Sequence, residues 1–322
     1  MTRILSKLFA TAFCLVTLTA SALAQEFPTK PVRIIVPFAP GGLNDVVGRM
    51  IAHHLTERFG RQVIVENRTG AGGVVGTELV ANSPKDGHTL LIVSIAHAVN
   101  PWLYKLNYDP SKSFAPIAPI LSSQNALAVN LDMPVKSLKD LLALAKQQPG
   151  KIQYASGGVG GSLHLAMELF KITAGVDLLH VPFRGAGPAV IDVIGGHTKA
   201  INATISTLSP HIRGGKLRAI GVSGKKRSDV LPDVPTIEEG GVPGYDAGNW
   251  IGLAAPAGTP DAIVARLHKE ISGMLELPDI QKQIASDGSE IMRMSPVEFA
   301  AYMDNEMAKW GRVVKTAGIT AQ

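Results

Sequence analysis

The hydrophobic residues of the chain follow two alternating patterns. Short, nearly continuous runs rich in Val, Ile and Leu are typical of strands buried on both faces, as in parallel sheets. Between these runs, apolar residues recur with the 3.6-residue period of a helix, and Val46, Val47, Met50, Ile51 and Leu55 form one such stripe. The alternation predicts an α/β fold with helices on both faces of mostly parallel sheets. The runs that predict strands are Val32–Phe38, Val63–Glu66, Leu90–Ser94, Ala126–Asn130, Ile152–Ser156, Leu178–Phe183, Leu217–Ser223 and Trp250–Ala254.

Two helix starts can be read directly from their capping residues. Ser137 is followed by Asp140 three residues later, and Ser295 is followed by Pro296 and Glu298. A serine before the helix with an acidic residue at the third helical position is the capping-box pattern, and proline is favoured at the first helical position. We therefore expect helices to begin directly after Ser137 and Ser295.

The first 24 residues have the three parts of a secretory signal peptide. Arg3 and Lys7 precede an apolar core from about Leu8 to Leu18, and Ala22-Leu23-Ala24 matches the A-x-A cleavage site. The apolar core is shorter than the roughly 20 residues that span a bilayer, which argues against a membrane anchor. We expect cleavage after Ala24 and export to the periplasm.

The rest of the chain is long enough for two lobes. A domain typically holds roughly 100–150 residues, and no low-complexity linker divides the 322-residue chain into halves. The runs Ala126–Asn130 and Gly248–Ala254 are apolar and extended, and they stand where the chain could leave one lobe and return. We expect them to be hinge strands, with residues 25–125 and 250–322 forming a discontinuous first lobe and residues 126–249 the second.

Composition excludes several classes of function. The only cysteine, Cys14, lies in the signal peptide, so the mature chain is expected to have no disulfide, no thiol nucleophile and no Cys metal site. The 31 Lys and Arg residues slightly outnumber the 26 Asp and Glu residues and are spread along the chain. Nucleic-acid binding would need these basic residues gathered on one face. A modest positive balance instead suits a small anionic ligand.

Four glycine-rich junctions each follow a predicted strand and precede a helical pattern. Ligands of open α/β sheets bind at the carboxyl ends of the strands, where such turns lie. Glycine lets the turn expose backbone N–H groups at the start of the following helix, where an anion can bind. We expect at least two of the junctions to contact a ligand. They are Pro40-Gly41-Gly42, Gly70-Ala71-Gly72-Gly73, Gly157–Ser162 and Arg184–Pro188.

Known nucleotide, catalytic and metal motifs are incomplete in this chain. The stretch "GAGGVVG" has Val75 where a dinucleotide fingerprint needs its third glycine, and "GVSGKK" has Lys226 where a P-loop needs Ser or Thr. Ser162 lies near His164, but two residues apart on a helix the side chains point apart. His53 and His54 are adjacent and face different sides of a helix. We expect neither catalysis, nor a metal site, nor a cofactor.

Three polar residues beside the junctions admit two interpretations. His97 could be a structural histidine or contact a ligand, and His164 fits a structural role in the first turn of its helix. Arg184 could bind a carboxylate through two parallel N–H···O hydrogen bonds, or lie at the surface as most arginines do.

Taken in order, these junctions resemble the Bug family, the periplasmic substrate-binding proteins of tripartite tricarboxylate transporters. Each stretch alone is weak, but together they run through essentially the whole mature chain. The matching stretches are "PVRIIVPFAPGGLNDVVGRMIAHHL", "VIVENRTGAGGVVGTELVANSPKDGHTLL", "AHAVNP", "YASGGVGGSLHLAMELF", "VPFRGAGPAVIDVIGGH", "GVSGKKRSDVLPDVPTIEEGG" and "NWIGLAAPAGTP".

The resemblance implies a type II periplasmic-binding-protein fold, with two lobes that close over one ligand in the cleft between them. It also implies that the turn Pro40–Asp45 and the loop Gly157–Ser162 hold a carboxylate through backbone groups. Carried over position by position, the ligand-binding residues would be Phe38, Gly41, Gly42, Asp45, Ser94, His97, Ser156, Gly160, Gly161, Ser162, Arg184, Gly185 and Pro188.

The implied function is that of a monomeric receptor that delivers a small carboxylate to a membrane permease. The segment before His97 is often richer in Ser and Thr in the family than Ser94-Ile95-Ala96 is here. Fewer hydroxyl groups favour a mono- or dicarboxylate with an apolar or aromatic body over a tricarboxylate. The alternatives are an extracytoplasmic sensor that feeds a signalling kinase and a secreted hydrolase on the same scaffold.

Overall fold

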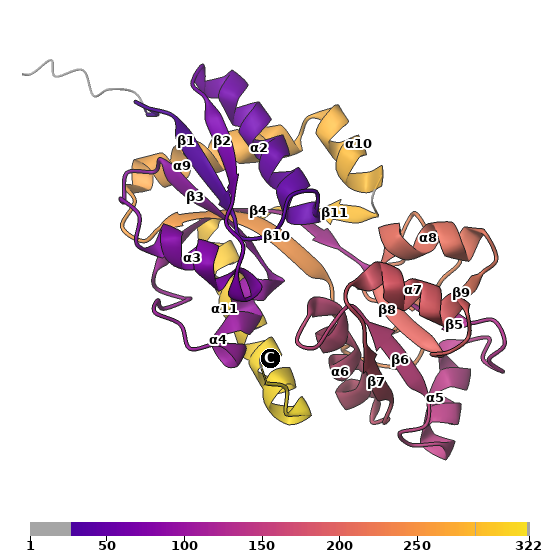
Figure 1. Cartoon of the computed structure of the whole chain (residues 1–322). Coiled ribbons are helices and arrows are strands. Elements are labelled where there is room, and N and C mark those ends of the chain that lie inside the picture. Colours follow the sequence, from indigo (N-terminus) through magenta and orange to yellow (C-terminus); the bar gives the residue numbers. More distant parts are fainter. Residues whose placement is uncertain (1–26, 287, 321–322) are drawn as a thin grey trace, which may run out of the picture.

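The computed structural model describes residues 27–286 and 288–320 as two α/β lobes that lie side by side (Figure 1). Each lobe is built on one sheet, and we call the lobe with the six-stranded sheet lobe 1 and that with the five-stranded sheet lobe 2. The predicted signal peptide, residues 1–24, lies outside the described residues. Within residues 27–286 and 288–320, no helix is both long and apolar enough to span a membrane.

The sheet of lobe 1 has the strand order β11-β4-β10-β3-β1-β2. β1 is parallel to β2 and β3, whereas β10 is antiparallel to β3 and β4, and β11 is antiparallel to β4. The strands are β1 (Val32–Val36), β2 (Val63–Asn67), β3 (Thr89–Ser94), β4 (Phe114–Ser123), β10 (Asn249–Pro256) and β11 (Ser289–Ile291). The helices are α2 (Leu43–Phe59), η2 (Ala71–Gly73), α3 (Val74–Ala81), α4 (Ile95–Leu103), α9 (Asp261–Leu275), α10 (Pro278–Ser286) and α11 (Pro296–Ala317).

Successive residues of the central strands pack on opposite faces of this sheet, as the continuous apolar runs predict. Ile34 and Val36 of β1 belong to one core cluster with Ile51 and Leu55 of α2. Ile35 between them belongs to a second cluster, on the side of α4 and α11. All are essentially inaccessible to solvent. Burying one such side chain contributes about 1.5–3 kcal/mol, so the sheet is fixed from both faces.

The sheet of lobe 2 has the strand order β7-β6-β8-β5-β9. β6 is parallel to β7 and β8, whereas β5 is antiparallel to β8 and β9. The strands are β5 (Asn125–Asn130), β6 (Gln153–Ser156), β7 (Leu179–Pro182), β8 (Ala200–Thr204) and β9 (Leu217–Val222), and the helices are α5 (Leu138–Gln147), α6 (Ser162–Ala174), α7 (Ala186–Ile194) and α8 (Ile205–Arg213).

The α/β class is confirmed, and so are the capping boxes at Ser137 and Ser295. The prediction of mostly parallel sheets holds for the direction of most strands in each sheet, but the pairing is mixed. The reversed strands include β5 and β10, which match the two predicted hinge strands. Both carry the chain between lobes without a helical crossover of the kind that makes neighbouring strands parallel, which explains the difference.

The chain passes between the lobes at two neighbouring points. It leaves lobe 1 at the junction of β4 and β5 and returns at the start of β10, and Ser123 is the register partner of Asn249 across these strands. The C-terminal helix α11 packs on α4 of lobe 1 and on α6 of lobe 2. One core cluster therefore runs from lobe 1 into lobe 2. The lobe limits given above, residues 25–125 with 250–322 and residues 126–249, stay a prediction.

Candidate functional site

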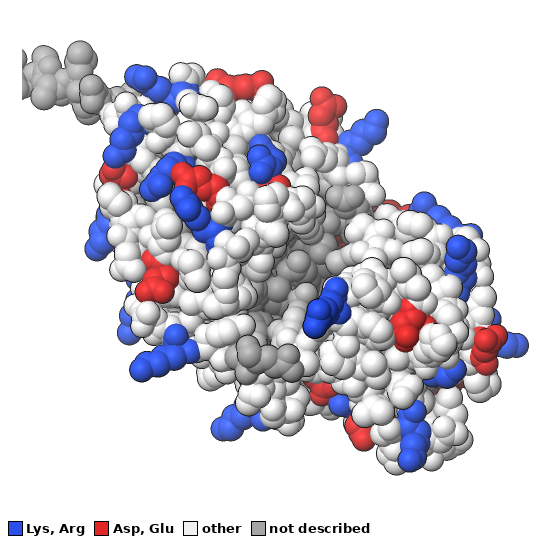
Figure 2. Space-filling view, viewed as in Figure 1, with Lys and Arg blue, Asp and Glu red and all other residues white. Residues whose placement is uncertain are grey.

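A cavity of about 330 Å³ lies between the lobes, where the loops at the strand ends meet. The space-filling view shows a groove between the two halves, and few charged side chains border it (Figure 2). Lobe 1 and the return strand contribute Phe38, Asn44, Gly72, Ser94, Ile95, Ala96, Val99, Asn100, Leu103, Tyr104 and Asn249, and lobe 2 contributes Val159, Gly160, Gly161, Ser162 and Leu165.

Three helices begin at this cavity. Asn44 lies in the first turn of α2, Ser94 is the N-cap of α4, and Gly161 is the N-cap of α6. Within the described residues, none of the three N-caps accepts a side-chain hydrogen bond from its helix. The first N–H groups of a helix have no partner inside it, and the helix dipole adds partial positive charge at this end. The cavity is thus surrounded by sites that favour an anion.

No charged side chain is found among the described residues that line the cavity. Its polar side chains are neutral, and the amide of Asn100 donates to the carbonyl of Gly72 at 3.1 Å. Val99, Leu103 and Leu165 supply apolar wall. An anion bound here would be held by backbone and neutral groups, while an apolar ligand body could contact the aliphatic wall.

The glycine turn of lobe 1 is held by the carboxylate of Asp45. Oδ2 of Asp45 accepts from the Gly41 N–H at 2.9 Å and from Arg49 Nε at 2.9 Å, and Oδ1 accepts from Asn67 Nδ2 at 2.9 Å. The hydrogen bond from Arg49 lowers the pKa of Asp45 to about 2, against the effect of burial. In this conformation the Gly41 N–H is therefore used within the turn rather than offered to a ligand.

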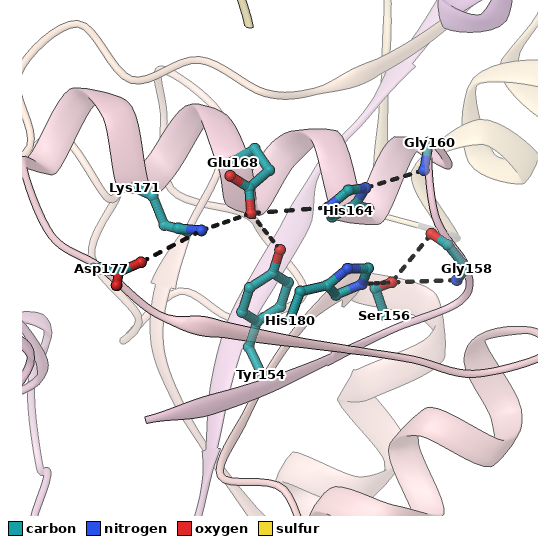
Figure 3. A network of polar contacts seen from close by, with 9 residues as sticks. All are labelled: Tyr154, Ser156, Gly158, Gly160, His164, Glu168, Lys171, Asp177 and His180. Carbon is teal, nitrogen blue, oxygen red and sulfur yellow. Dashed lines mark hydrogen bonds and ion pairs between the residues drawn. The ribbon is translucent and has the colours of Figure 1, made fainter. Parts of the chain in front are cut away.

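The glycine loop of lobe 2 is held by uncharged groups (Figure 3). The N–H of Gly160 donates to Nδ1 of His164 at 3.0 Å. The N–H of Gly158 donates to Oγ of Ser156 at 3.2 Å, and the same Oγ lies 2.6 Å from Nε2 of His180. Gly158 and Gly160 have φ values of +139° and +72°, which residues with a Cβ rarely adopt.

The structure brings some of the predicted binding residues to the cavity wall and leaves others behind it. The wall contains Phe38, Ser94, Gly160, Gly161 and Ser162. Gly41 and Gly42 lie in the turn before α2, and Asp45 lies in the first turn of that helix beside Asn44. Ser156 is buried beneath the loop of lobe 2. Arg184, Gly185 and Pro188 lie before and in the first turn of α7, and this turn reaches the loop, because a Cβ on Gly157 would come within 3.5 Å of Gly185 Cα.

His97 lies behind the cavity. Its Nε2 is 2.9 Å from the carbonyl oxygen of Pro110, and its ring meets that of Phe114 edge to face. Nδ1 has no hydrogen-bond partner among the described residues. Burial lowers the pKa of His97, which keeps the ring neutral. These contacts favour the structural interpretation over direct ligand contact.

Sequence reasoning missed four polar residues of the wall, which are Asn44, Asn100, Tyr104 and Asn249. Asn44 could have been found, because it follows the Pro-Gly-Gly turn in the first turn of α2. Asn100 lies one helical turn after His97. Tyr104 and Asn249 carry no local signal, because only the packing of α4 against β10 brings them to the same cavity.

Ser162 and His164 do not form a nucleophile–base pair. Nδ1 of His164 is occupied by the Gly160 N–H, and Nε2 lies on the side of Glu168, 3.8 Å from Oε1. No hydrogen bond joins Ser162 to a histidine in the described part of the chain. In the same part, no three His, Cys, Asp or Glu residues are grouped to hold a metal ion.

Comparison with known proteins identifies one family. The sequence profile described as the tripartite tricarboxylate transporter family receptor matches residues 47–319. The protein BugT of Bordetella pertussis is 33% identical over 304 residues, which cover 94% of this chain and 93% of BugT.

Two solved structures share both sequence and fold with the chain. The Rhodopseudomonas palustris protein Rpa4515, solved with adipate, is 33% identical with a TM-score of 0.78, over 92% of this chain and all of that one. MatC of the same organism, solved with bound malate, is 33% identical with a TM-score of 0.74, over 89% of this chain and 100% of MatC. The likeness extends over both lobes.

Proposed function

Because the chain belongs to the tripartite tricarboxylate transporter receptor family, and to the Bug proteins within it, we propose that it captures a small carboxylate between its lobes and delivers it to the membrane subunits of such a transporter. The chain is a substrate-binding receptor. One observation carries the choice of ligand: three helix N-termini without side-chain caps face a cavity whose described lining residues are all uncharged. An anion would supply the charge that the cavity lacks.

The ligand is a mono- or dicarboxylate with an apolar body, which can be aromatic. Val99, Leu103 and Leu165 offer it apolar contact, and the neutral side chains offer few donors for a third carboxylate. Two relatives of similar fold were solved with adipate and with malate, which are both dicarboxylates. This supports a ligand of the same size and charge.

The lobes close over this ligand. The helix starts of α2 and α4 hold it from lobe 1, and the loop Gly157–Ser162 holds it from lobe 2. Gly42, at the exposed start of α2, and Arg184, in the exposed turn before α7, are brought to the ligand by closure. The two neighbouring chain crossings at Ser123 and Asn249 form the hinge.

The receptor works in the periplasm as a monomer after cleavage at Ala24, without a cofactor and without catalysis. A sensor that feeds a signalling kinase is the alternative, because ligand-driven closure serves both functions equally. A hydrolase is disfavoured, because Nδ1 of His164 accepts from Gly160 and Nε2 faces Glu168 rather than Ser162.

A carboxylate screen tests the proposal. Adipate, malate, succinate and benzoate would be added to the purified mature protein, and the melting temperature would be recorded, followed by calorimetric titration. A ligand at 100 times its dissociation constant adds about 2.7 kcal/mol of stability, so a true ligand gives a clear shift. The amides of the same acids are the matched controls. Equal shifts in melting temperature from acid and amide, or no shift from a broad set of carboxylates, would contradict the proposal that the protein is a carboxylate receptor.

A further inference from the structure

Two histidines stack face to face directly beneath the glycine loop of lobe 2 (Figure 3). The ring centroids of His164, from α6, and His180, from β7, are 3.9 Å apart, and the ring planes differ by 9°. The ring of Tyr154, from β6, stacks on His180 at 4.9 Å. His164 is 5% exposed. This stack does not line the cavity, and neither histidine has a role in the function proposed above.

Each histidine is bonded to a different part of the loop. Nδ1 of His164 accepts the Gly160 N–H at 3.0 Å, so this nitrogen must carry a lone pair. Nε2 of His180 lies 2.6 Å from Oγ of Ser156, and that oxygen lies 3.2 Å from both the nitrogen and the carbonyl oxygen of Gly158. The loop is therefore held at Gly158 and at Gly160, on either side of Val159 in the cavity wall.

The charged groups around the stack are themselves engaged. Oε1 of Glu168 lies 3.8 Å from Nε2 of His164, accepts from the hydroxyl of Tyr154 at 2.6 Å and pairs with Lys171 at 2.9 Å. Lys171 also faces Asp177 at 3.7 Å. The positive charge of Lys171 offsets the stabilisation that Glu168 would give to a protonated His164. Burial lowers the pKa of His164, and burial together with His164 lowers the pKa of His180 to about 4.

We infer that His164 and His180 are positioning residues for the carboxylate site: as neutral rings they hold Gly160 and Gly158 in place, and a proton on Nδ1 of His164 releases Gly160. The inference rests on the proposed function, because the loop is taken to bind the carboxylate. A protonated Nδ1 of His164 cannot accept the Gly160 N–H. Two cationic rings 3.9 Å apart would also repel each other, so a positive charge on one ring disfavours protonation of the other.

A pH series on matched variants tests the inference with adipate or malate as the probe, whichever binds more tightly. In His164→Asn, the side-chain oxygen stands near the position of Nδ1 and can accept the Gly160 N–H, but it does not titrate. His164→Leu has a similar volume and no acceptor. His53→Asn changes a histidine whose side chain is 79% exposed, on α2, and serves as the control.

At pH 7.5 we expect His164→Asn to bind within about threefold of wild type and His164→Leu to bind about tenfold more weakly, the range of one hydrogen bond. As the pH falls from 6 to 4, wild type and His53→Asn should lose affinity more steeply than His164→Asn. Comparing variants at each pH cancels the titration of the probe itself. A wild-type profile that coincides with that of His164→Asn, or a folded His164→Leu that binds as tightly as wild type, would overturn the inference.

A second readout needs no ligand. Amide hydrogen exchange by NMR should show a protected Gly160 N–H in wild type and in His164→Asn, with protection lost in His164→Leu and in wild type at pH 4. If His164→Leu does not fold, His180→Gln and His164→Asn decide. His180→Gln keeps a polar atom towards Ser156 and leaves His164 to titrate, so its Gly160 N–H should lose protection at pH 4 as in wild type, while that of His164→Asn should stay protected. Unchanged Gly160 protection from pH 7.5 to 4 would overturn the inference. If no carboxylate binds at any pH, the receptor proposal fails, while the exchange data still decide on the loop.

Discussion

The two lobes each bring a glycine turn to the cavity, but they fix these turns with different chemistry. In lobe 1 a buried carboxylate, Asp45, accepts three hydrogen bonds from Gly41, Arg49 and Asn67. In lobe 2 two neutral imidazoles hold Gly158 and Gly160, one of them through Ser156. A backbone that must keep its N–H groups oriented can thus be supported by an ion or by uncharged bases.

The difference gives the two turns separate pH windows. The pKa of Asp45 is lowered from 3.8 to about 2, so its contribution to stability is complete above about 4 and is lost as the pH falls towards 2. The pKa of His180 is lowered from 6.5 to about 4. Here the unfolded chain takes up a proton before the folded chain does, so stability falls between pH 6.5 and 4. As the pH falls, the turn of lobe 2 therefore loses stability at a higher pH than the turn of lobe 1.

We expect the largest effect, on the free energy of unfolding, when the charge of Asp45 is removed. Asp45→Asn keeps the shape but sets an amide N–H₂ against a donor, and it weakens the hydrogen bond from Arg49. Hydrogen bonds to charged groups contribute about 1.5–3 kcal/mol, so we expect a loss of roughly 2–3 kcal/mol in urea unfolding. Asp132→Asn, at an exposed position in lobe 2, is the matched control. A loss no greater than that of the control would mean that the ion does not fix the turn.

Gly42→Pro should have the next largest effect, on affinity rather than stability. Gly42 has a φ of −81°, and a Cβ there meets only Ala39 O at 3.9 Å, so proline removes an N–H with little strain. If closure brings this N–H to the carboxylate, affinity falls about tenfold to a hundredfold. Leu43→Ala at the same turn should change it much less. Titration calorimetry decides, and a folded Gly42→Pro protein with wild-type affinity would remove this turn from the site.

His180 in lobe 2 should contribute to the loss of stability in acid. We expect the free energy of unfolding of wild type to fall as the pH goes from 6.5 to 4, and His180→Gln to flatten this decrease, because it removes the group that titrates differently in the two states. The effect should be smaller than that of Asp45→Asn at neutral pH. Chemical unfolding at several pH values measures it. If the free energy of unfolding of His180→Gln falls as steeply with pH as that of wild type, other groups cause the loss of stability.

The smallest effect is expected at Ser162, the hydroxyl in the cavity wall from lobe 2. Ser162→Ala should weaken carboxylate binding by about 0.5–1.5 kcal/mol, the net contribution of one hydrogen bond. It should change no turnover, since no base reaches this hydroxyl among the described residues. Ester and amide hydrolysis by wild type that disappears in Ser162→Ala would instead establish a nucleophile and reject the receptor.

The sequence predicted the strands whose apolar runs are uninterrupted and missed the others. It did not predict β4, because Pro116 and Pro119 interrupt the apolar run and proline is unfavourable inside a sheet. The structure accommodates them opposite Ala254 and Gly252, where the register of β4 with β10 shifts. β8 and β11 are short and carry few branched apolar residues, so their pairing depends on neighbours far away in sequence.

The site divides in the same way. The glycine loops could be predicted, because glycine marks backbone conformations that other residues rarely adopt and because these glycines follow predicted strands. The stack of His164 and His180 could not be foreseen, because it depends on the parallel pairing of β6 with β7, which sets Tyr154 beside His180, and on α6 returning over that sheet. Asn249 could not be predicted as a cavity residue either, because its position depends on how β10 pairs within the sheet of lobe 1.

The position of β10 has a consequence for the order in which the protein acquires its structure. β10 lies between β3 and β4 in the sheet of lobe 1, but it is made only after all five strands of lobe 2. A growing chain can complete the sheet of lobe 2 first, while lobe 1 lacks its middle strand and leaves β3 and β4 with open edges. We expect hydrogen exchange on a free chain truncated near residue 245 to show β5–β9 more protected than β1–β4, and the reverse order would contradict this. Lobe 2, which is inserted in sequence between the two parts of lobe 1, would thus fold first. The strands β1–β4, although synthesised first, would complete their sheet last.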